Sequence, residues 1–515
     1  MHATTSRFTW PLGLSTGLLI LAVATSPLAA QQTATKPAAP AKPAATVATP
    51  VVAVPQQASF DRNTIPPAGK TPVLQVPSWT RTTLANGVQL IVSEKHTLPL
   101  VSFSLTFIGG SAQYEPANRR GLAGITASML SEGTKTRDGE ALSTALQLLG
   151  TGVGVSVGAE SGAIGFGCTS GNFADTAGLM ADMMLNSTFP AEALERIRAQ
   201  RLVSLTQAKS QPRSIASRVF PRVLYGTDHP YWAVSTEESL KAITRDDVVG
   251  FWKAFAQPAR AVIIVTGDIT PAAAKAVLDK ALAAWPAGGA KAAFVYPPLP
   301  KAQPTTIYLV DKPGAAQSTF AIGLPGPERS TPDYYALEVM NTMLGGMFQS
   351  RLNANIREEK GLSYGVSSRF AYGRGPGAFR AGGDIISAKS DVALVEFMKE
   401  LKGIGGARPV SDDELQTAKD SLVQSLPERF ASVRSVGYTI QELVTDGLPD
   451  TYFQQYGAAV MKVTKDDVVR VARKYIDMEH LAIVIVGDRA TIEAPLKATG
   501  IAPIVLLDIE GAVVK

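Results

Sequence analysis

The feature that most constrains this chain is an internal repeat whose two copies lie 220 residues apart. Both copies read Thr, a basic residue, then Asp-Asp-Val-Val, beginning at Thr244 and Thr464, and in each a Gly-Asp pair follows at the end of an apolar run. A threonine followed by acidic residues is typical of a capped helix start, and a short run rich in Val and Ile is typical of a buried strand. Because both features recur in register, we predict two homologous domains.

Further strand patterns precede each copy of this motif. Residues 85–88 favour a hairpin turn, and residues 101–107 alternate between apolar and small polar side chains as in a half-buried strand. In the second copy, residues 306–310 and 318–323 are the corresponding strand candidates. We therefore predict an α+β fold with a mixed sheet packed against helices in each repeat. The expected layout is a first domain at 78–286, a linker rich in Gly, Ala and Pro at 287–304, a second domain at 305–490 and a C-terminal tail at 491–515.

The first 77 residues differ in composition from the rest of the chain. Residues 1–30 contain one strong charge, Arg7, then an apolar run and small residues near Ala30, a pattern typical of a secretory signal peptide. The apolar run is shorter than the roughly 20 residues of a membrane span, which disfavours the alternative of an uncleaved anchor. Residues 31–77 are rich in Ala and Pro and predict an extended tether. We expect an exported protein, periplasmic in a Gram-negative bacterium, with no stable membrane anchor after cleavage.

Composition excludes several classes of protein. With 45% hydrophobic and 18% charged residues, the chain is typical of a folded globular protein. The net charge of +5 is mild, and no block of Lys and Arg is present, which argues against nucleic acid as a partner. Cys168 is the single cysteine, so a disulfide framework is excluded.

One segment of the first repeat resembles a known zinc motif. Residues 121–130, followed by Gly-Thr at 133–134, are similar to the helix of the M16 metallopeptidase family, which includes pitrilysin and the mitochondrial processing peptidase. In that family an inverted His-x-x-Glu-His helix supplies two zinc ligands and the glutamate that activates water. The matching positions here are Gly124, Ala127 and Ser128, which offer neither imidazole nor carboxylate. The resemblance implies two domains of the LuxS and processing-peptidase metallohydrolase type with a degenerate zinc motif.

The remaining candidate residues do not supply the missing zinc ligands. The family's third ligand, a glutamate, aligns near Ser204, and serine is not a plausible zinc ligand. After signal cleavage, the histidines are His96, His229 and His480, and no two are close enough in sequence to form a chelating pair. We therefore predict no metal and no cofactor in this chain.

The second repeat resembles a different functional segment of the family. Arg357 and Tyr364 match, in type and spacing, an arginine and tyrosine that face the zinc across the family's closed chamber. Their side chains can donate hydrogen bonds to a substrate carbonyl and to the oxyanion formed during attack. The alternative is that Arg357 lies at a solvated helix end and Tyr364 belongs to the core. Arg351 is expected to be structural.

The resemblance implies a non-catalytic subunit of an exported M16-type zinc metalloendopeptidase. In a heterodimer, a partner with an intact zinc motif would hold the zinc, and this chain would complete the chamber around a peptide substrate. Candidate chamber walls are residues 153–158 and 365–368, whose glycines permit close backbone approach. Self-pairing, and a structural or chaperone-like peptide-binding role without proteolysis, are the alternatives. A hydrolase with Cys168 or another nucleophile is disfavoured because no histidine lies nearby in sequence.

Overall fold

The computed structural model describes residues 74–291 and 293–514. The predicted signal peptide at 1–30 and the tether as far as residue 73 lie outside this range. Within the described residues, no helix has the length and apolar character needed to cross a membrane.

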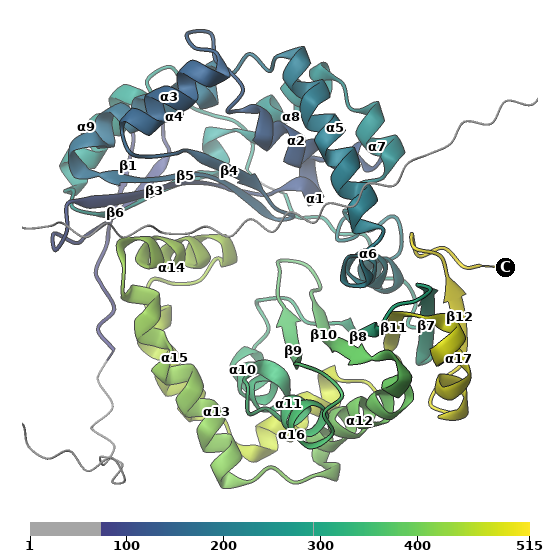
Figure 1. Ribbon diagram of the computed structural model, residues 1–515. Helices are drawn as coiled ribbons and strands as arrows, with labels where there is room; N and C mark the ends of the chain where they lie inside the picture. The colour runs from purple at the N-terminus through teal and green to yellow at the C-terminus, as the bar shows by residue number, and fades with distance from the viewer. Residues whose placement is uncertain (1–73, 292, 515) are drawn as a thin grey trace, which may run out of the picture. The chain divides into compact units, whose positions relative to one another are not determined.

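The first repeat is organised around a six-stranded sheet with the strand order β1-β2-β6-β3-β5-β4 (Figure 1). β2 and β6 are parallel, whereas the other neighbouring strands are antiparallel. The strands are β1 (Thr80–Thr83), β2 (Gln89–Glu94), β3 (Leu100–Ile108), β4 (Gly154–Val157), β5 (Ser161–Thr169) and β6 (Ala261–Gly267). The helices are α1 (Ser111–Tyr114), α2 (Leu122–Met129), α3 (Gly139–Leu148), α4 (Phe173–Asn186), α5 (Ala191–Ala208), α6 (Pro212–Tyr225), α7 (Glu237–Ala242), α8 (Arg245–Phe255) and α9 (Pro271–Ala281).

The second repeat has its own six-stranded sheet, in the order β12-β7-β11-β8-β10-β9. β7 is parallel to β11 and β12, and the remaining neighbours are antiparallel. The strands are β7 (Thr306–Asp311), β8 (Gln317–Pro325), β9 (Val366–Ala371), β10 (Ala378–Ile386), β11 (Ala482–Gly487) and β12 (Ile504–Leu507). The helices are α10 (Tyr334–Asn341), α11 (Arg351–Asn353), α12 (Ser390–Lys402), α13 (Asp412–Gln424), α14 (Val433–Asp446), α15 (Tyr452–Met461), α16 (Lys465–Tyr475) and α17 (Arg489–Ala498). The predicted α+β architecture with two mixed sheets is thus confirmed.

The repeated motif forms the same structure in both domains. Thr244 precedes α8 and Thr464 precedes α16, and each threonine forms a reciprocal capping box with the aspartate three residues later. These hydrogen bonds satisfy backbone N–H groups that the first helical turn leaves free. Each helix leads to a buried central strand, β6 or β11, that ends at a glycine.

The two sheets differ at one edge. In the first sheet the edge strand β1 precedes β2 in the chain and is antiparallel to it, whereas in the second sheet β12 follows β11 in the chain and is parallel to β7. The segment 491–515, expected to be a C-terminal tail, contains most of α17 and all of β12. The half-buried residues 504–506 and the buried Leu507 pair along β7, which the short apolar run alone did not indicate.

Each repeat contributes one helix to the sheet of the other repeat. α14 packs on β3 and β6 of the first sheet, opposite the face that α3 and α4 cover (Figure 1), and α6 packs on β8 and β11 of the second sheet. On α6, a buried apolar face that includes Ile215, Val219 and Phe220 contacts Ala321 and Val484 of the second sheet. The starts of α6 and α14, at Pro212 and Val433, are 221 residues apart, which is within one residue of the repeat offset, so the exchange follows the internal symmetry of the chain.

Candidate functional site

The degenerate zinc-motif positions lie together on α2. Gly121 at the helix N-cap adopts a φ of 102°, a left-handed conformation that favours glycine. The Glu115 carboxylate accepts hydrogen bonds at 2.9 Å from the backbone N–H groups of Gly121 and Ala123, which fixes the start of α2. Burial raises the pKa of Glu115 above its usual range despite these bonds. Gly124 and Ser128 lie one turn apart on α2 and are both half-buried.

An arginine from α5 lies against this part of α2. The Nη2 atom of Arg201 donates a hydrogen bond to the Ser128 Oγ atom at 3.0 Å. The same Nη2 atom lies 4.0 Å from the place where a Cβ atom of residue 124 would stand. Ser128 in turn donates from Oγ to the carbonyl oxygen of Gly124 at 3.0 Å. A permanently charged guanidinium therefore lies beside the positions that correspond to two zinc ligands.

The other motif positions add no metal donor. Ala127 is buried, and Ser204 is exposed on α5 with its Oγ donating to the Gln200 carbonyl at 2.9 Å. Zinc needs thiolate, imidazole or carboxylate ligands, and a nearby guanidinium opposes a divalent cation electrostatically. The residues present do not fit a zinc ion. Sequence reasoning did not find Arg201, because its contact with α2 depends on how α5 packs and not on a motif.

Arg357 and Tyr364 lie on a separate, exposed part of the second repeat. Arg357 belongs to a π-helical segment, η5 (Ala354–Glu359), and its Nε atom is 3.2 Å from the Oε1 atom of Glu358. The Arg357 guanidinium also stacks 4.4 Å from the centre of the Phe348 ring. Tyr364 is 91% exposed, so it is not a core residue. Within the described residues, neither side chain hydrogen-bonds to α2.

Arg351, by contrast, is buried and structural. Its Nη2 atom lies 2.7 Å from the Glu414 Oε2 atom, and its other N–H groups donate to the carbonyls of Arg408 and Pro409. These bonds tie α11 to the start of α13. The sequence-based prediction of a structural role agrees with these contacts.

The three histidines of the described residues lie in different environments. His229 is 1% exposed and stacks on Tyr225 and Tyr296, and burial lowers its pKa. His96 is exposed, and hydrogen bonds to Asp268 and then Glu94 raise its pKa. His480 bonds to Asp477 on the surface. Over residues 74–291 and 293–514, no group of three or more His, Cys, Asp and Glu side chains is arranged to hold a metal ion.

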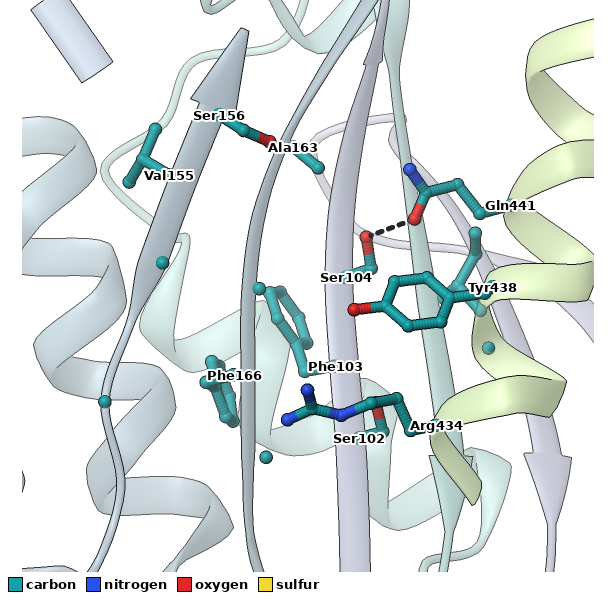
Figure 2. Close-up of a pocket in the computed structure, with 16 residues that line it drawn as sticks. Ser102, Phe103, Ser104, Val155, Ser156, Ala163, Phe166, Arg434, Tyr438 and Gln441 are labelled. Atoms are coloured by element: carbon teal, nitrogen blue, oxygen red, sulfur yellow. Dashed lines mark hydrogen bonds between the residues drawn. The ribbon is translucent and has the colours of Figure 1, made fainter. Parts of the chain in front are cut away.

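A cavity of about 410 Å³ lies between α14 and the first sheet (Figure 2). It includes part of the wall segment expected at 153–158, and its sheet side presents small residues such as Ser104, Ser156 and Ala163. Gln441 of α14 accepts a hydrogen bond from Ser104 Oγ at 3.2 Å, drawn as a dashed line in Figure 2. The cavity is thus bordered by the sheet on one side and by α14 on the other.

A second cavity, of about 420 Å³, lies at the equivalent place between α6 and the second sheet. It includes residues 365–367 of the other expected wall segment. Its walls carry the arginines Arg213, Arg369 and Arg380 and the carboxylate of Asp384. The two cavities therefore occupy corresponding positions but differ in charge, since the first is lined by a single charged residue, Arg434 of α14.

Comparison with known proteins agrees with this architecture. Residues 90–227 match the family described as Insulinase (Peptidase family M16), and residues 242–422 match the Peptidase M16 inactive domain. The chain is 24% identical over 404 residues to a Helicobacter pylori protein named Non-peptidase homolog YmxG, covering 78% of this chain and 92% of the relative. It is 25% identical over 361 residues to a Bacillus subtilis protein named Uncharacterized zinc protease YmxG, covering 69% and 85%.

Solved structures give the same assignment. A Pseudomonas fluorescens structure described as a peptidase M16 inactive domain superposes with a TM-score of 0.72 at 26% identity, covering 79% of this chain and 98% of the other. The first matched region lies within the first repeat, and the second runs from α8 of the first repeat into the second repeat as far as α13. The chain therefore belongs to the M16 peptidase family.

Proposed function

We propose that this chain is the zinc-less subunit of an exported M16 zinc metalloendopeptidase. The observation that supports this most directly is the contact between Arg201 and Ser128, which places a fixed positive charge beside the former ligand positions of α2. Such a chain would need a second M16 subunit with an intact zinc motif in order to cleave peptides. The partner would supply the zinc, the attacking water and the general base.

The proposed contribution of this chain is to bind and orient the substrate from the opposite side. The phenol of Tyr364 is free to donate a hydrogen bond to a scissile carbonyl, since 91% of the residue is exposed. Arg357 lies seven residues earlier, and its guanidinium is half-buried against Phe348. Stacking on Phe348 would preorganise the guanidinium, so that it stabilises negative charge on the substrate oxygen with little reorganisation.

A structural or chaperone-like role without proteolysis is the second candidate. It is favoured by the Helicobacter pylori relative, which is named a non-peptidase homolog. On this account a homodimer or heterodimer would bind peptides, and Arg357 and Tyr364 would be dispensable.

The test is peptide hydrolysis by the purified chain, alone and mixed with a zinc-motif M16 homologue from the same source. Wild type, Tyr364→Phe and Arg357→Lys are compared, with the exposed neighbour Glu359→Gln as the matched control. We expect cleavage only in the mixture, with a reduction of about tenfold or more for Tyr364→Phe and none for Glu359→Gln. A mixture that is indifferent to Tyr364 and Arg357 favours the structural role, and chelator-sensitive cleavage by this chain alone contradicts both candidates.

Export is tested separately by cell fractionation. We expect the full-length precursor to yield a mature chain shortened near residue 30 in the exported fraction. A chain that keeps residues 1–30 in the membrane fraction contradicts this part of the proposal.

A further inference from the structure

The second-repeat cavity contains two arginines that face each other across neighbouring strands. Arg369 of β9 is paired directly with Arg380 of β10 in the antiparallel register. On β9 the buried residues alternate with exposed ones, so Arg369 points to the face that α6 covers. Like charges placed directly opposite each other destabilise a sheet, so this pair carries an energetic cost that its surroundings should explain.

The carboxylate in the cavity, Asp384, attracts Arg380 electrostatically but forms no ion pair with either arginine. Asp384 is 16% exposed at its side chain, accepts a hydrogen bond at 2.7 Å from Thr319, and forms an ion pair with Arg213 of α6. Within the described residues, no acidic oxygen lies within 4.0 Å of the charged nitrogens of Arg369 or Arg380. The cavity therefore keeps an excess of positive charge.

The partly buried environment of Arg380 favours a strong interaction between its guanidinium and an anion. The residue is half-buried, and its guanidinium lies 5.6 Å from the centre of the Phe220 ring on α6. Burial, followed by repulsion from Arg369, lowers the pKa of Arg380. An anion that entered the cavity would relieve the repulsion and would meet N–H donors in a partly dehydrated setting.

The first repeat shows which residues occupy the positions equivalent to Arg369 and Arg380. Thr266 of β6 and Val486 of β11 are equivalent in the repeats, and the strand pairings lead from them to Gly167 and Asp384, respectively. These two residues are therefore equivalent positions of β5 and β10.

Four residues earlier on the same strands, Ala163 is equivalent to Arg380. Ala163 pairs with Ser156 of β4, just as Arg380 pairs with Arg369 of β9. Figure 2 shows Ser156 and Ala163 side by side in the first-repeat cavity. In the first repeat, the equivalent sheet and its exchanged helix α14 thus pack with a serine and an alanine at these positions. The fold therefore does not require the arginines.

We propose that the second-repeat cavity binds the carboxylates of an acidic peptide segment. Two facing guanidiniums match carboxylate groups, and the cavity volume of about 420 Å³ is within the range of ligand sites. Gly365 leaves backbone within reach of the ligand, since a Cβ atom there would meet only the Asn353 side chain at 3.8 Å, and this favours a peptide over a bulkier polymer. The site belongs to this chain alone and stands whether or not the chain pairs with a zinc-bearing subunit.

The test is fluorescence anisotropy with the full mature chain and a labelled peptide of alternating Glu and Thr. The comparison variant is Arg369→Ser with Arg380→Ala, which installs the residues of the first repeat. The charge control is Lys253→Ser with Lys280→Ser, which removes the same number of charges from exposed positions of the first repeat. Arg369→Glu is the second variant, chosen because Arg369 is exposed and the new carboxylate faces Arg380.

We expect the acidic peptide to bind wild type at least about tenfold more tightly than a peptide of alternating Gln and Thr. Both arginine variants should lose this preference, and the lysine variant should keep it. Equal binding of the acidic peptide by wild type and the arginine variants overturns the proposal. So does tighter binding of an oligothymidylate of equal charge, or displacement of the peptide by inorganic phosphate but not by glutarate.

Discussion

The Nη2 atom of Arg201 lies 3.0 Å from the Oγ atom of Ser128, across the contact between α5 and α2. A guanidinium remains protonated at any pH at which the protein is folded. At the positions that match the family's zinc motif, the side chains therefore offer no metal ligand, and a fixed positive charge lies beside them.

Restoring the ligands alone should not restore zinc binding. We expect Gly124→His, Ala127→Glu, Ser128→His and Ser204→Glu together to bind zinc weakly, and the further change Arg201→Ala to strengthen binding at least about tenfold, because a unit charge about 4 Å away opposes the cation. Competition with a chromogenic chelator measures the affinity. Arg196→Ala on the same helix is the control, and equal zinc affinity with and without Arg201 contradicts the prediction.

Arg351 should contribute strongly to stability. It is 3% exposed and holds Glu414 and two carbonyls through part-buried hydrogen bonds, so truncation removes these bonds and leaves a cavity where the side chain was. We expect Arg351→Ala to lower the free energy of unfolding by about 3 kcal/mol. The exposed pair of Lys241 and Glu237 is the comparison, with less than about 0.5 kcal/mol expected for Lys241→Ala. Urea denaturation distinguishes the two, and similar small effects would contradict the structural role of Arg351.

Protonation of the Asp333 carboxylate should lower the free energy of unfolding in acid. Burial alone would raise its pKa, but hydrogen bonds from Lys474, Arg470 and Tyr475 outweigh this and lower the pKa to about 2. A depressed pKa stabilises the folded state above the unfolded pKa, and this contribution, about 2 kcal/mol, is lost as pH falls from about 5 towards 2. Asp333→Asn should therefore destabilise the chain at about pH 7 and roughly half as much at about pH 3. A destabilisation that is equal at both pH values excludes this linkage.

The facing arginines should lower the free energy of unfolding although they promote binding of the acidic peptide. We expect Arg369→Ser to raise the free energy of unfolding by up to about 1 kcal/mol, because it removes a like charge opposite Arg380. The gain should shrink at high salt, which screens the repulsion. Thermal unfolding at low and high salt measures both effects. Loss of stability in Arg369→Ser would mean that the arginine has a packing role in the sheet.

The repeated motif allowed much of the fold to be predicted. The cap residues Thr244 and Thr464 define α8 and α16 locally, and the following apolar runs form the central strands β6 and β11. The exchange of α6 and α14 was not predictable in this way. An apolar helix face indicates that a helix is buried, but not which sheet covers it, because that choice depends on long-range packing.

Some residues of the candidate sites could likewise be predicted from the sequence, and others could not. Gly124, Ala127 and Ser128 could be recognised because a motif on one helix has fixed spacing. The contact of Arg201 depends on helix packing, and the meeting of Arg369 and Arg380 depends on the register of β9 and β10. A one-residue shift in that register would separate the two guanidiniums, so a sequence pattern alone does not reveal the pair.

The reciprocal placement of α6 and α14 also bears on how the chain can be divided. A cut within 287–304 would leave each half without the helix that covers one face of its sheet, and it would expose the apolar side of the helix that the half retains. Neither half would then be a self-sufficient folding unit. The arrangement matches that of a domain-swapped pair whose members are joined by a linker. Each half therefore completes the core of the other.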